Sequence, residues 1–376
     1  MKNKKIFEFL KVIINILYFA SMMMIGGYIG IKYIELEFIE FFSILLVAML
    51  GICIVYFISI IWHELGHLFF GIKAKLKFIS FSVLNFIITK ENNKLTIKKT
   101  PTMPGIGGYC NMEFDEDTEY NKRKITNFFL GGIIFNIVFV LLFSILLIFC
   151  NSTYLNIIII SFIVTNLYMA LYNSMPFITV SGGNTDMLHI INCYKDAEYI
   201  KVLSRADKIQ NLLSNGCELK EIDENLFYMP KDFSNSSKVL MAQLYIDYIA
   251  EKEQYKEAIE HIKTILKTTE NTLPKSHIIL FKINLIYYAF KGGFNLEIIS
   301  EYWNKDIRKY LEAMGNFEPQ FIGINYMYSS LIEKDKKKAQ SYLKQFEQIK
   351  KKHPNKESIE ETEKTILDVN ERLMVK

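Results

Sequence analysis

Apolar residues form long unbroken runs in the first half of the chain, whereas the second half has the mixed apolar and charged pattern of amphipathic helices. A helix needs about 20 apolar residues to cross a bilayer. The uncharged stretch that follows Ile125 and ends at Thr185 is too long for one helix, and Asn151-Ser152-Thr153 supplies a polar turn within it. We therefore predict four transmembrane helices, at residues 12–33, 41–70, 126–150 and 154–177.

The segment between the second and third predicted spans has strand-like features. Residues 75–89 are rich in Phe, Ile, Val and Ser, Glu91-Asn92-Asn93-Lys94 is a turn signal, and residues 94–100 alternate apolar and polar side chains. We predict a membrane-associated β-hairpin at about residues 75–100. The glycine-rich residues 104–112 that follow are predicted to form a turn.

Helix pairs are predicted beyond about residue 195. The pattern places helices at 239–250 and 255–266, at about 275–312 with a break at Gly292-Gly293, and at 321–332 and 339–349. Pairs at intervals of roughly 35 to 45 residues are typical of a tetratricopeptide-like solenoid, with an irregular helical bundle as the alternative. The predicted division is therefore a first transmembrane helix (1–40), a membrane core (41–194) and a cytoplasmic helical domain (195–376). The fold class is mainly α, a polytopic membrane protein.

Composition narrows the possible functions. The chain has 376 residues, of which 22% are charged, and its net charge of +4 is too small and too dispersed for nucleic-acid binding. The cysteines have no paired spacing, which argues against a disulfide framework or a cysteine zinc site: Cys53, Cys110, Cys150, Cys193 and Cys217. The first apolar run is longer than the core of a signal peptide and no cleavage site stands out, so we expect a retained membrane helix.

The positions of Lys and Arg predict the orientation in the membrane. Basic residues precede the first span and fill the segment between the second and third spans, whereas the opposite side carries Glu35, Glu37 and Glu40 with only Lys32 at its edge. Because basic loops stay in the cytoplasm, both termini are predicted to be cytoplasmic. The abundance of Lys, Ile and Asn is typical of a bacterial protein from an AT-rich genome.

His63-Glu64-Leu65-Gly66-His67 stands at the end of the second apolar run. Residues i and i+4 of a helix lie on the same face, so His63 and His67 can bind one metal ion with Glu64 beside it as a base. Ionisable residues at membrane depth are costly to bury and mark functional sites. The spacing predicts a zinc site within or at the edge of a membrane helix.

A catalytic zinc ion needs a third protein ligand and an open position for water. Asp186 and His189 follow the fourth span directly, after Pro176 and the glycines of residues 181–183. Pro176 ends or kinks the helix, and the glycines allow the chain to fold back toward the second span. We predict Asp186 as the third ligand, with His189 as the alternative.

With these residues assembled, the chain resembles the site-2 protease family of intramembrane zinc metalloproteases over roughly residues 41–190. The resemblance rests on the His63-Glu64-x-x-His67 helix, on Gly107-Gly108-Tyr109 after the hairpin, on Gly131 to Asn136 at the start of the next span, and on Asn173-x-x-Pro176 with a downstream Asp. Two positions depart from the family. Ile133 stands where proline is common, and Ser181-Gly182-Gly183 stands where the family often has Asp-Gly-Gly, so that Asp186 supplies the ligand after a short insertion or the site is degenerate.

The resemblance implies an intramembrane protease that cuts a membrane-bound regulator or peptide precursor. It implies Zn²⁺ as cofactor, His63, His67 and Asp186 as ligands, and Glu64 as the catalytic base. It also implies that Asn173, Gly107 and Gly108 help to hold the substrate, with the hairpin as a clamp for an extended strand. The alternative is a non-catalytic relative that binds or sequesters a membrane peptide, with the helical domain as an adaptor. A cytoplasmic protein partner for that domain is expected in either case.

Overall fold

The computed structural model describes residues 2–32, 37–91, 94–99, 107–114, 118–179, 182–269, 273–351, 353 and 356–374. The chain is mainly helical and divides into two compact units. Unit 1 comprises Met1–Ile97, Gly105–Cys217 and Asn235–Met241. Unit 2 comprises Lys98–Pro104, Glu218–Ser234 and Ala242–Lys376.

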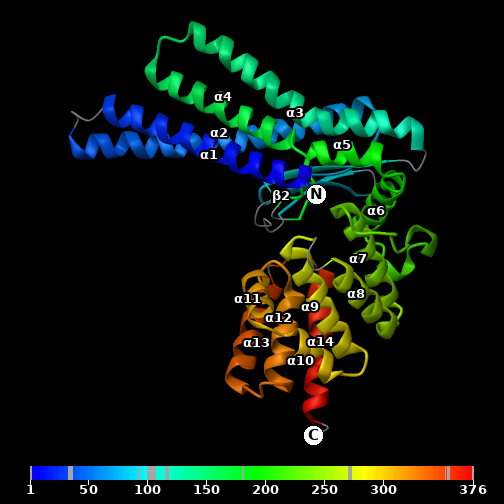
Figure 1. Cartoon of the computed structure of the whole chain (residues 1–376). Coiled ribbons are helices and arrows are strands. Elements are labelled where there is room, and N and C mark those ends of the chain that lie inside the picture. Colours follow the sequence, from blue (N-terminus) through cyan, green and yellow to red (C-terminus); the bar gives the residue numbers. More distant parts are fainter. Residues whose placement is uncertain are drawn as a thin grey trace. The chain divides into compact units, whose positions relative to one another are not determined.

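Four long apolar helices form the membrane part of unit 1 and lie side by side (Figure 1). They are α1 (Lys2–Lys32), α2 (Phe38–Lys73), α3 (Thr118–Phe149) and α4 (Thr153–Asn173). All four are long and apolar enough to span a bilayer, as the sequence predicted. The last one ends at Asn173, before the predicted limit of 177, because a residue that precedes proline, here Met175 before Pro176, disfavours helical backbone.

Helices α2 and α3 cross with their backbones in close contact. A Cβ atom added to Gly66 would overlap the carbonyl group of Gly131, and one added to Gly131 would overlap that of Gly66. Such an approach is possible only where neither helix carries a side chain. The crossing therefore fixes the register of the two helices one residue before His67.

A four-stranded antiparallel sheet follows α2 and packs against it. Its strands are β1 (Lys77–Val83), β2 (Phe86–Glu91), β3 (Lys94–Lys99) and β4 (Gly108–Glu113), in the order β3-β2-β1-β4. The fourth strand corrects our prediction of a turn, which extended over Gly108. Cys110 and Met112 alternate with polar neighbours and are buried beneath the sheet, so the period of two continues directly after the glycines.

The rest of unit 1 closes around the end of the helix bundle. Helix α5 (Asp186–Lys195) packs against α3, and α6 (Tyr199–Ser214) packs against β4 and α3. Together they cover an apolar cluster that includes Met112, Ile125, Phe128 and Tyr199. This cluster supports the loop that leads from α4 into α5.

Unit 2 consists mainly of helices, where the sequence predicted helix pairs. These are the later part of α7 (Ser236–Glu251), α8 (Tyr255–Thr269), α9 (Lys275–Lys291), α10 (Leu296–Tyr302), α11 (Lys305–Met314), α12 (Pro319–Leu331), α13 (Lys336–Lys350) and α14 (Lys356–Met374). The last helix was not predicted, and it packs against α12. The break at Gly292-Gly293 is real, since Gly293 has φ of 119° and the helix ends there.

Candidate metal centre

His63 and His67 lie one turn apart on α2, as their spacing requires, and both are buried. Their rings meet edge to face with centroids 4.8 Å apart. The two Nε2 atoms are 3.2 Å apart and point to a common position. The two histidines that follow the long apolar run of α2 thus direct their Nε2 atoms to one point.

Helix α3 orients both rings through their other nitrogens. Nδ1 of His67 lies 2.8 Å from the carbonyl oxygen of Phe128, to which it donates a hydrogen bond. Nδ2 of Asn136 lies 3.0 Å from Nδ1 of His63, and Oδ1 of Asn136 is buried with no hydrogen-bond partner among the described residues. Exchanging the amide nitrogen and oxygen of Asn136 gives Oδ1 a partner, because Nδ1–H of His63 then donates to it. In this tautomer both Nε2 atoms keep their lone pairs, which is the arrangement that metal-binding histidines use.

Asp186, the first residue of α5, completes the group. Its Oδ1 lies 3.4 Å from Nε2 of His67, and its Oδ2 lies 3.4 Å from Nε2 of His63. Oδ2 is buried and has no hydrogen-bond partner in the described part of the chain. Burial alone would raise the pKa of the Asp186 carboxyl, but the positive charge of the neighbouring imidazoles in their protonated form outweighs it and holds that pKa below its ordinary value. When the imidazoles are neutral, a bound metal ion would supply that charge in their place.

The residues present fit a metal ion. Two imidazole nitrogens and one carboxylate oxygen lie within 4.8 Å of one another, and among the described residues they form the one such group of three. Their lone pairs converge without a hydrogen-bond donor between them, and an orphaned buried oxygen needs a cationic partner. Two histidines and one carboxylate with an open fourth position are a usual ligand set of catalytic zinc sites.

Glycines clear the space around this group. A Cβ atom at Gly132 of α3 would lie 2.5 Å from Nε2 of His67 and 2.5 Å from Cε1 of His63. A Cβ atom at Gly108 of β4 would lie 3.0 Å from Cγ of Glu64, and one at Gly107 would lie 2.7 Å from Cδ1 of Ile60. The backbones of α3 and β4 thus approach α2 from two directions, next to the three predicted residues of its motif.

The other predicted site residues lie in different settings. Glu64 is buried on α2 between the two histidines in sequence and faces β4 at Gly108. Asn173 ends α4, and its amide donates to the carbonyl oxygen of Met169 at 3.1 Å, within its own helix. It contributes no ligand atom to the group of three.

His189, the alternative ligand, is held away from the group. Its ring stacks on Phe129 with centroids 4.1 Å apart and an interplanar angle of 8°. Its Nδ1 is hydrogen-bonded to the hydroxyl group of Tyr199. Burial lowers the pKa of His189 to about 4, so the ring is neutral at neutral pH. The geometry favours Asp186 as the third donor.

Sequence reasoning missed the groups that orient the two imidazoles. The carbonyl group of Phe128 carries no side-chain signal, so only the helix crossing could reveal it. Asn136 was noted as part of a family element but not as the partner of His63. Asn136 lies well inside the uncharged third span and is a usable signal, because a buried amide in a membrane needs a partner.

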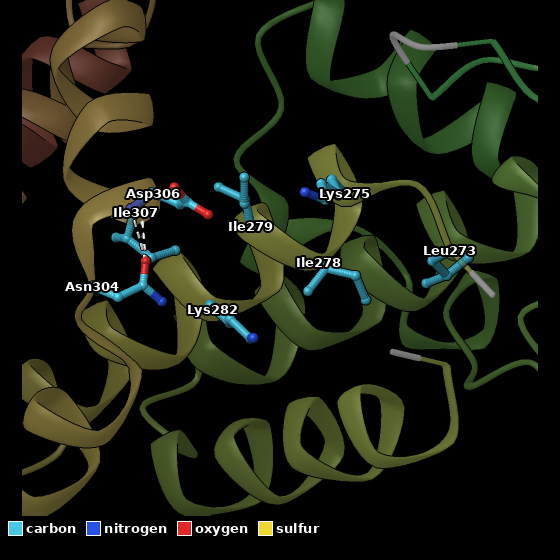
Figure 2. Close-up of a pocket in the computed structure, with 8 residues that line it drawn as sticks. All are labelled: Leu273, Lys275, Ile278, Ile279, Lys282, Asn304, Asp306 and Ile307. Carbon is cyan, nitrogen blue, oxygen red and sulfur yellow. Dashed lines mark hydrogen bonds between the residues drawn. The ribbon is translucent and has the colours of Figure 1, made fainter. Parts of the chain in front are cut away.

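Unit 2 contains a hollow of about 210 Å³ with a different character (Figure 2). Its polar centre is Asn304, whose Oδ1 already accepts hydrogen bonds from the backbone N–H groups of Asp306 at 2.9 Å and Ile307 at 3.0 Å. The remaining lining is apolar or lysine: Leu273, Lys275, Ile278, Ile279 and Lys282. The residues that line it include one carboxylate, that of Asp306, and no histidine or cysteine, so this lining does not form a metal site like that of unit 1.

A metal-competent group of two histidines and a carboxylate, buried next to a glutamate among apolar helices, is typical of metal-dependent hydrolases. Comparison with protein families agrees with this class. The model of peptidase family M50 matches residues 51–350, well over half of the chain. The chain therefore belongs to peptidase family M50, the site-2 protease family, as its motifs predicted. No curated protein and no solved structure matches the chain.

Proposed function

We propose that the protein is an intramembrane zinc endopeptidase that hydrolyses a peptide bond in or next to a transmembrane segment of a membrane-bound substrate. The observation that carries this proposal is the convergence of His63, His67 and Asp186 on one position next to Glu64, at the end of a membrane helix. The membership in peptidase family M50 supports it independently.

In this proposal His63, His67 and Asp186 hold zinc. Zinc bound there supplies a Lewis acid that polarises the scissile carbonyl and acidifies water. Glu64 accepts the proton of the attacking water and transfers it to the leaving amine nitrogen. Asn136 and the carbonyl group of Phe128 keep the imidazole nitrogens directed at the metal, because they bind the opposite nitrogen of each ring.

The sheet provides a surface for an extended substrate. A transmembrane helix must open before its peptide bonds are accessible, and an outer strand can then accept it as an additional strand. The sequence predicts that the hairpin at residues 75–100 binds this extended strand, but β4 is the better candidate. It is an outer strand of the described sheet and adjoins Glu64 through Gly108. Gly107 and Gly108 then leave room for a substrate backbone, and Asn173 contributes to binding only after a rearrangement.

We also propose where in the cell the reaction takes place. The distribution of Lys and Arg favours cytoplasmic termini in a bacterial cell membrane, with the metal centre toward the cytoplasmic end of α2. The helices of unit 2 are suited to bind a cytoplasmic protein or the tail of the substrate, as tetratricopeptide-like domains do. The substrate is a membrane-bound regulator or peptide precursor.

Substitution of the predicted base tests the proposal. The purified protein in liposomes is mixed with a panel of single-span membrane peptides, and cleavage products are identified by mass spectrometry. We expect Glu64→Gln to lower cleavage by about 100-fold or more while zinc stays bound, because general-base catalysis contributes about 10²–10⁴. Glu40→Gln, at the exposed first turn of the same helix, is the matched control and should cleave at the wild-type rate.

Two results would contradict the proposal. Unaltered cleavage by Glu64→Gln would remove Glu64 from the chemistry. Zinc-free protein of full activity, measured by elemental analysis, would remove the metal. A zinc-bound protein that captures membrane peptides but cuts none of them would instead support the non-catalytic alternative.

A further inference from the structure

The loop before Asp186 is a small, tightly bonded structure. Oγ1 of Thr185 donates to the carbonyl oxygen of Met175 at 2.6 Å, and its backbone N–H donates to the carbonyl oxygen of Phe177 at 3.2 Å. Ile178 and Asn184 form an antiparallel bridge across the loop. These bonds connect the end of α4 to the start of α5. The position of Asp186 therefore follows the position of this loop.

The start of α7 is bonded to the same loop. Ser236 donates both its backbone N–H, at 3.3 Å, and its hydroxyl group to Oδ1 of Asn184. Asn184 precedes Asp186 by only two residues, although about fifty residues separate it from Ser236. A distant segment of the chain thus binds the side chain of a residue that lies two positions before the proposed third ligand.

Tyr199 joins these parts at a single hydroxyl group. Its side chain is fully buried, and its oxygen accepts from Nδ2 of Asn184 at 3.5 Å and lies 3.2 Å from Oγ of Ser237. The same hydroxyl group is hydrogen-bonded to Nδ1 of His189, one turn after Asp186. The loop, α5, α6 and α7 therefore share one connected polar network, and such networks specify a unique packing when all members are satisfied.

A buried lysine fixes the register of α7 in this network. Lys238 is 2% exposed, and its Nζ lies 2.7 Å from Oδ2 of Asp196 and 3.2 Å from Oε2 of Glu198. Those two acids stand directly before Tyr199 in the sequence. Loss of either partner of a buried ion pair is strongly destabilising, so α7 can start in only one position along α6.

We propose that residues 235–241 form a latch that positions Asp186 for metal binding through Asn184, Tyr199 and Ser237. After Glu218–Ser234 in unit 2, the chain returns to unit 1 for these seven residues, and the same helix then continues into unit 2. The latch rests on the proposed function, because it acts on the third zinc ligand. Seating of the first turn of α7 thereby sets the affinity of the centre for zinc.

Zinc affinity of the full-length protein in detergent, measured by competition with a chelator, tests the latch. Tyr199→Phe removes one hydroxyl group and keeps the ring. We expect about 10-fold weaker zinc binding, the low end of the effect of losing a group bonded directly to a metal ligand, because Tyr199 acts on Asp186 through Asn184. Cleavage by this variant should return toward the wild-type rate when zinc is added in excess. A merely structural role would instead lower the unfolding temperature and leave zinc affinity unchanged.

Milder variants keep the test decisive if Tyr199→Phe folds poorly. Ser237→Ala should weaken zinc binding in the same direction, and Ser237→Thr, which keeps the hydroxyl group, should restore it. Gln243→Ala is the matched control, because it removes a polar side chain from the same helix in unit 2, where its partner is Asp247. Its zinc affinity should equal that of the wild type.

Failure of the latch can be separated from failure of the proposed function. Wild-type zinc affinity in Tyr199→Phe and Ser237→Ala overturns the latch, whatever the behaviour of Asp186 itself. Wild-type zinc affinity in Asp186→Ala overturns the ligand set, and with it the proposed function as written. Weaker binding in the latch variants and in Asp186→Ala, with an unchanged control, supports both.

Discussion

Each unit contains a carboxylate in a polar cluster, buried in the case of Asp186 and partly buried in the case of Asp247, and the two clusters differ in what they lack. Asp247 of unit 2 accepts hydrogen bonds on one oxygen from Gln243 at 2.7 Å and Tyr288 at 2.6 Å, and from Asn284 at 3.5 Å. Asp186 of unit 1 faces two imidazole nitrogens, and one of its oxygens has no hydrogen-bond partner in the described part of the chain. The first cluster is complete, whereas the second needs a cation.

This difference separates a structural cluster from a functional one. Donors already occupy the acceptor of Asp247, so its cluster contributes to the packing of α7 against α9. Around Asp186 the lone pairs of three side chains converge on one point, which is unfavourable without a ligand. Burial of an acid is thus a weak indicator of function, and an unsatisfied acceptor is a stronger one.

The largest expected effect is the loss of zinc from unit 1 alone. We expect Asp186→Ala to weaken zinc binding by more than about 100-fold, because outer-shell changes by themselves cost about 10–100-fold. Asp247→Ala should leave zinc affinity within about 2-fold of the wild type, since its donors form no metal site. Chelator competition on both purified variants checks the contrast. Equal losses would mean that the two carboxylates do not differ in this way.

A smaller effect is expected from filling the space that Gly132 leaves open. A Cβ atom there overlaps both imidazoles, and overpacking costs about 1–3 kcal/mol, so Gly132→Ala should weaken zinc binding roughly 10-fold to 100-fold. Gly51→Ala on α2 is the control, because nothing lies within 4 Å of its added Cβ atom. Elemental analysis after dialysis measures how much zinc each variant retains. Full zinc content in Gly132→Ala would show that the two imidazole rings can move to accommodate the added methyl group.

The smallest effect concerns the pH dependence of unit 2. Burial raises the pKa of Asp247 to about 6, from an ordinary value of 3.8, with further repulsion from Glu361 and Glu251. The unfolded chain therefore loses this proton at a lower pH than the folded chain. The contribution of Asp247 to stability is most favourable below about pH 4 and declines as the pH rises through about 6.

Asp247→Asn should remove this decline. We expect its unfolding temperature, relative to that of the wild type, to rise by a few degrees between pH 4 and pH 7. Circular dichroism of the full-length protein in detergent measures the difference, and the comparison cancels the titration of the other carboxylates. A constant difference over this range would mean that the carboxyl group is not held above its ordinary pKa.

The sequence was informative where periodicity and spacing act locally. The four apolar helices follow from length alone, and the paired orientation of His63 and His67 follows from the helical repeat. The proximity of Asp186 to them was inferred from Pro176 and the following glycines, which require the chain to turn back. The first two predictions use only local sequence patterns. The third concerns the short connection between Pro176 and Asp186, which limits how far Asp186 can lie from the end of α4.

The sequence was uninformative where the site depends on contacts between distant segments. The glycines at the start of β4 predict a turn, whereas Cys110 and Met112 within it have the alternation of a strand. The clearance at Gly132 exists only because α3 crosses α2 at that residue. The contact of Ser236 with Asn184 joins segments about fifty residues apart, and no local pattern predicts it.

The close contact of α2 and α3 at Gly66 and Gly131 restricts which helices could separate to let a substrate reach the metal centre. A helix rises about 1.5 Å per residue, so sliding α2 along α3 by one position would separate His67 from the carbonyl group of Phe128 and His63 from Asn136 together. Separating the two helices would undo the same pair of bonds. In the proposed function, a path for an incoming peptide that preserves these bonds would therefore open at another helix contact, with α2 and α3 kept together as one rigid pair.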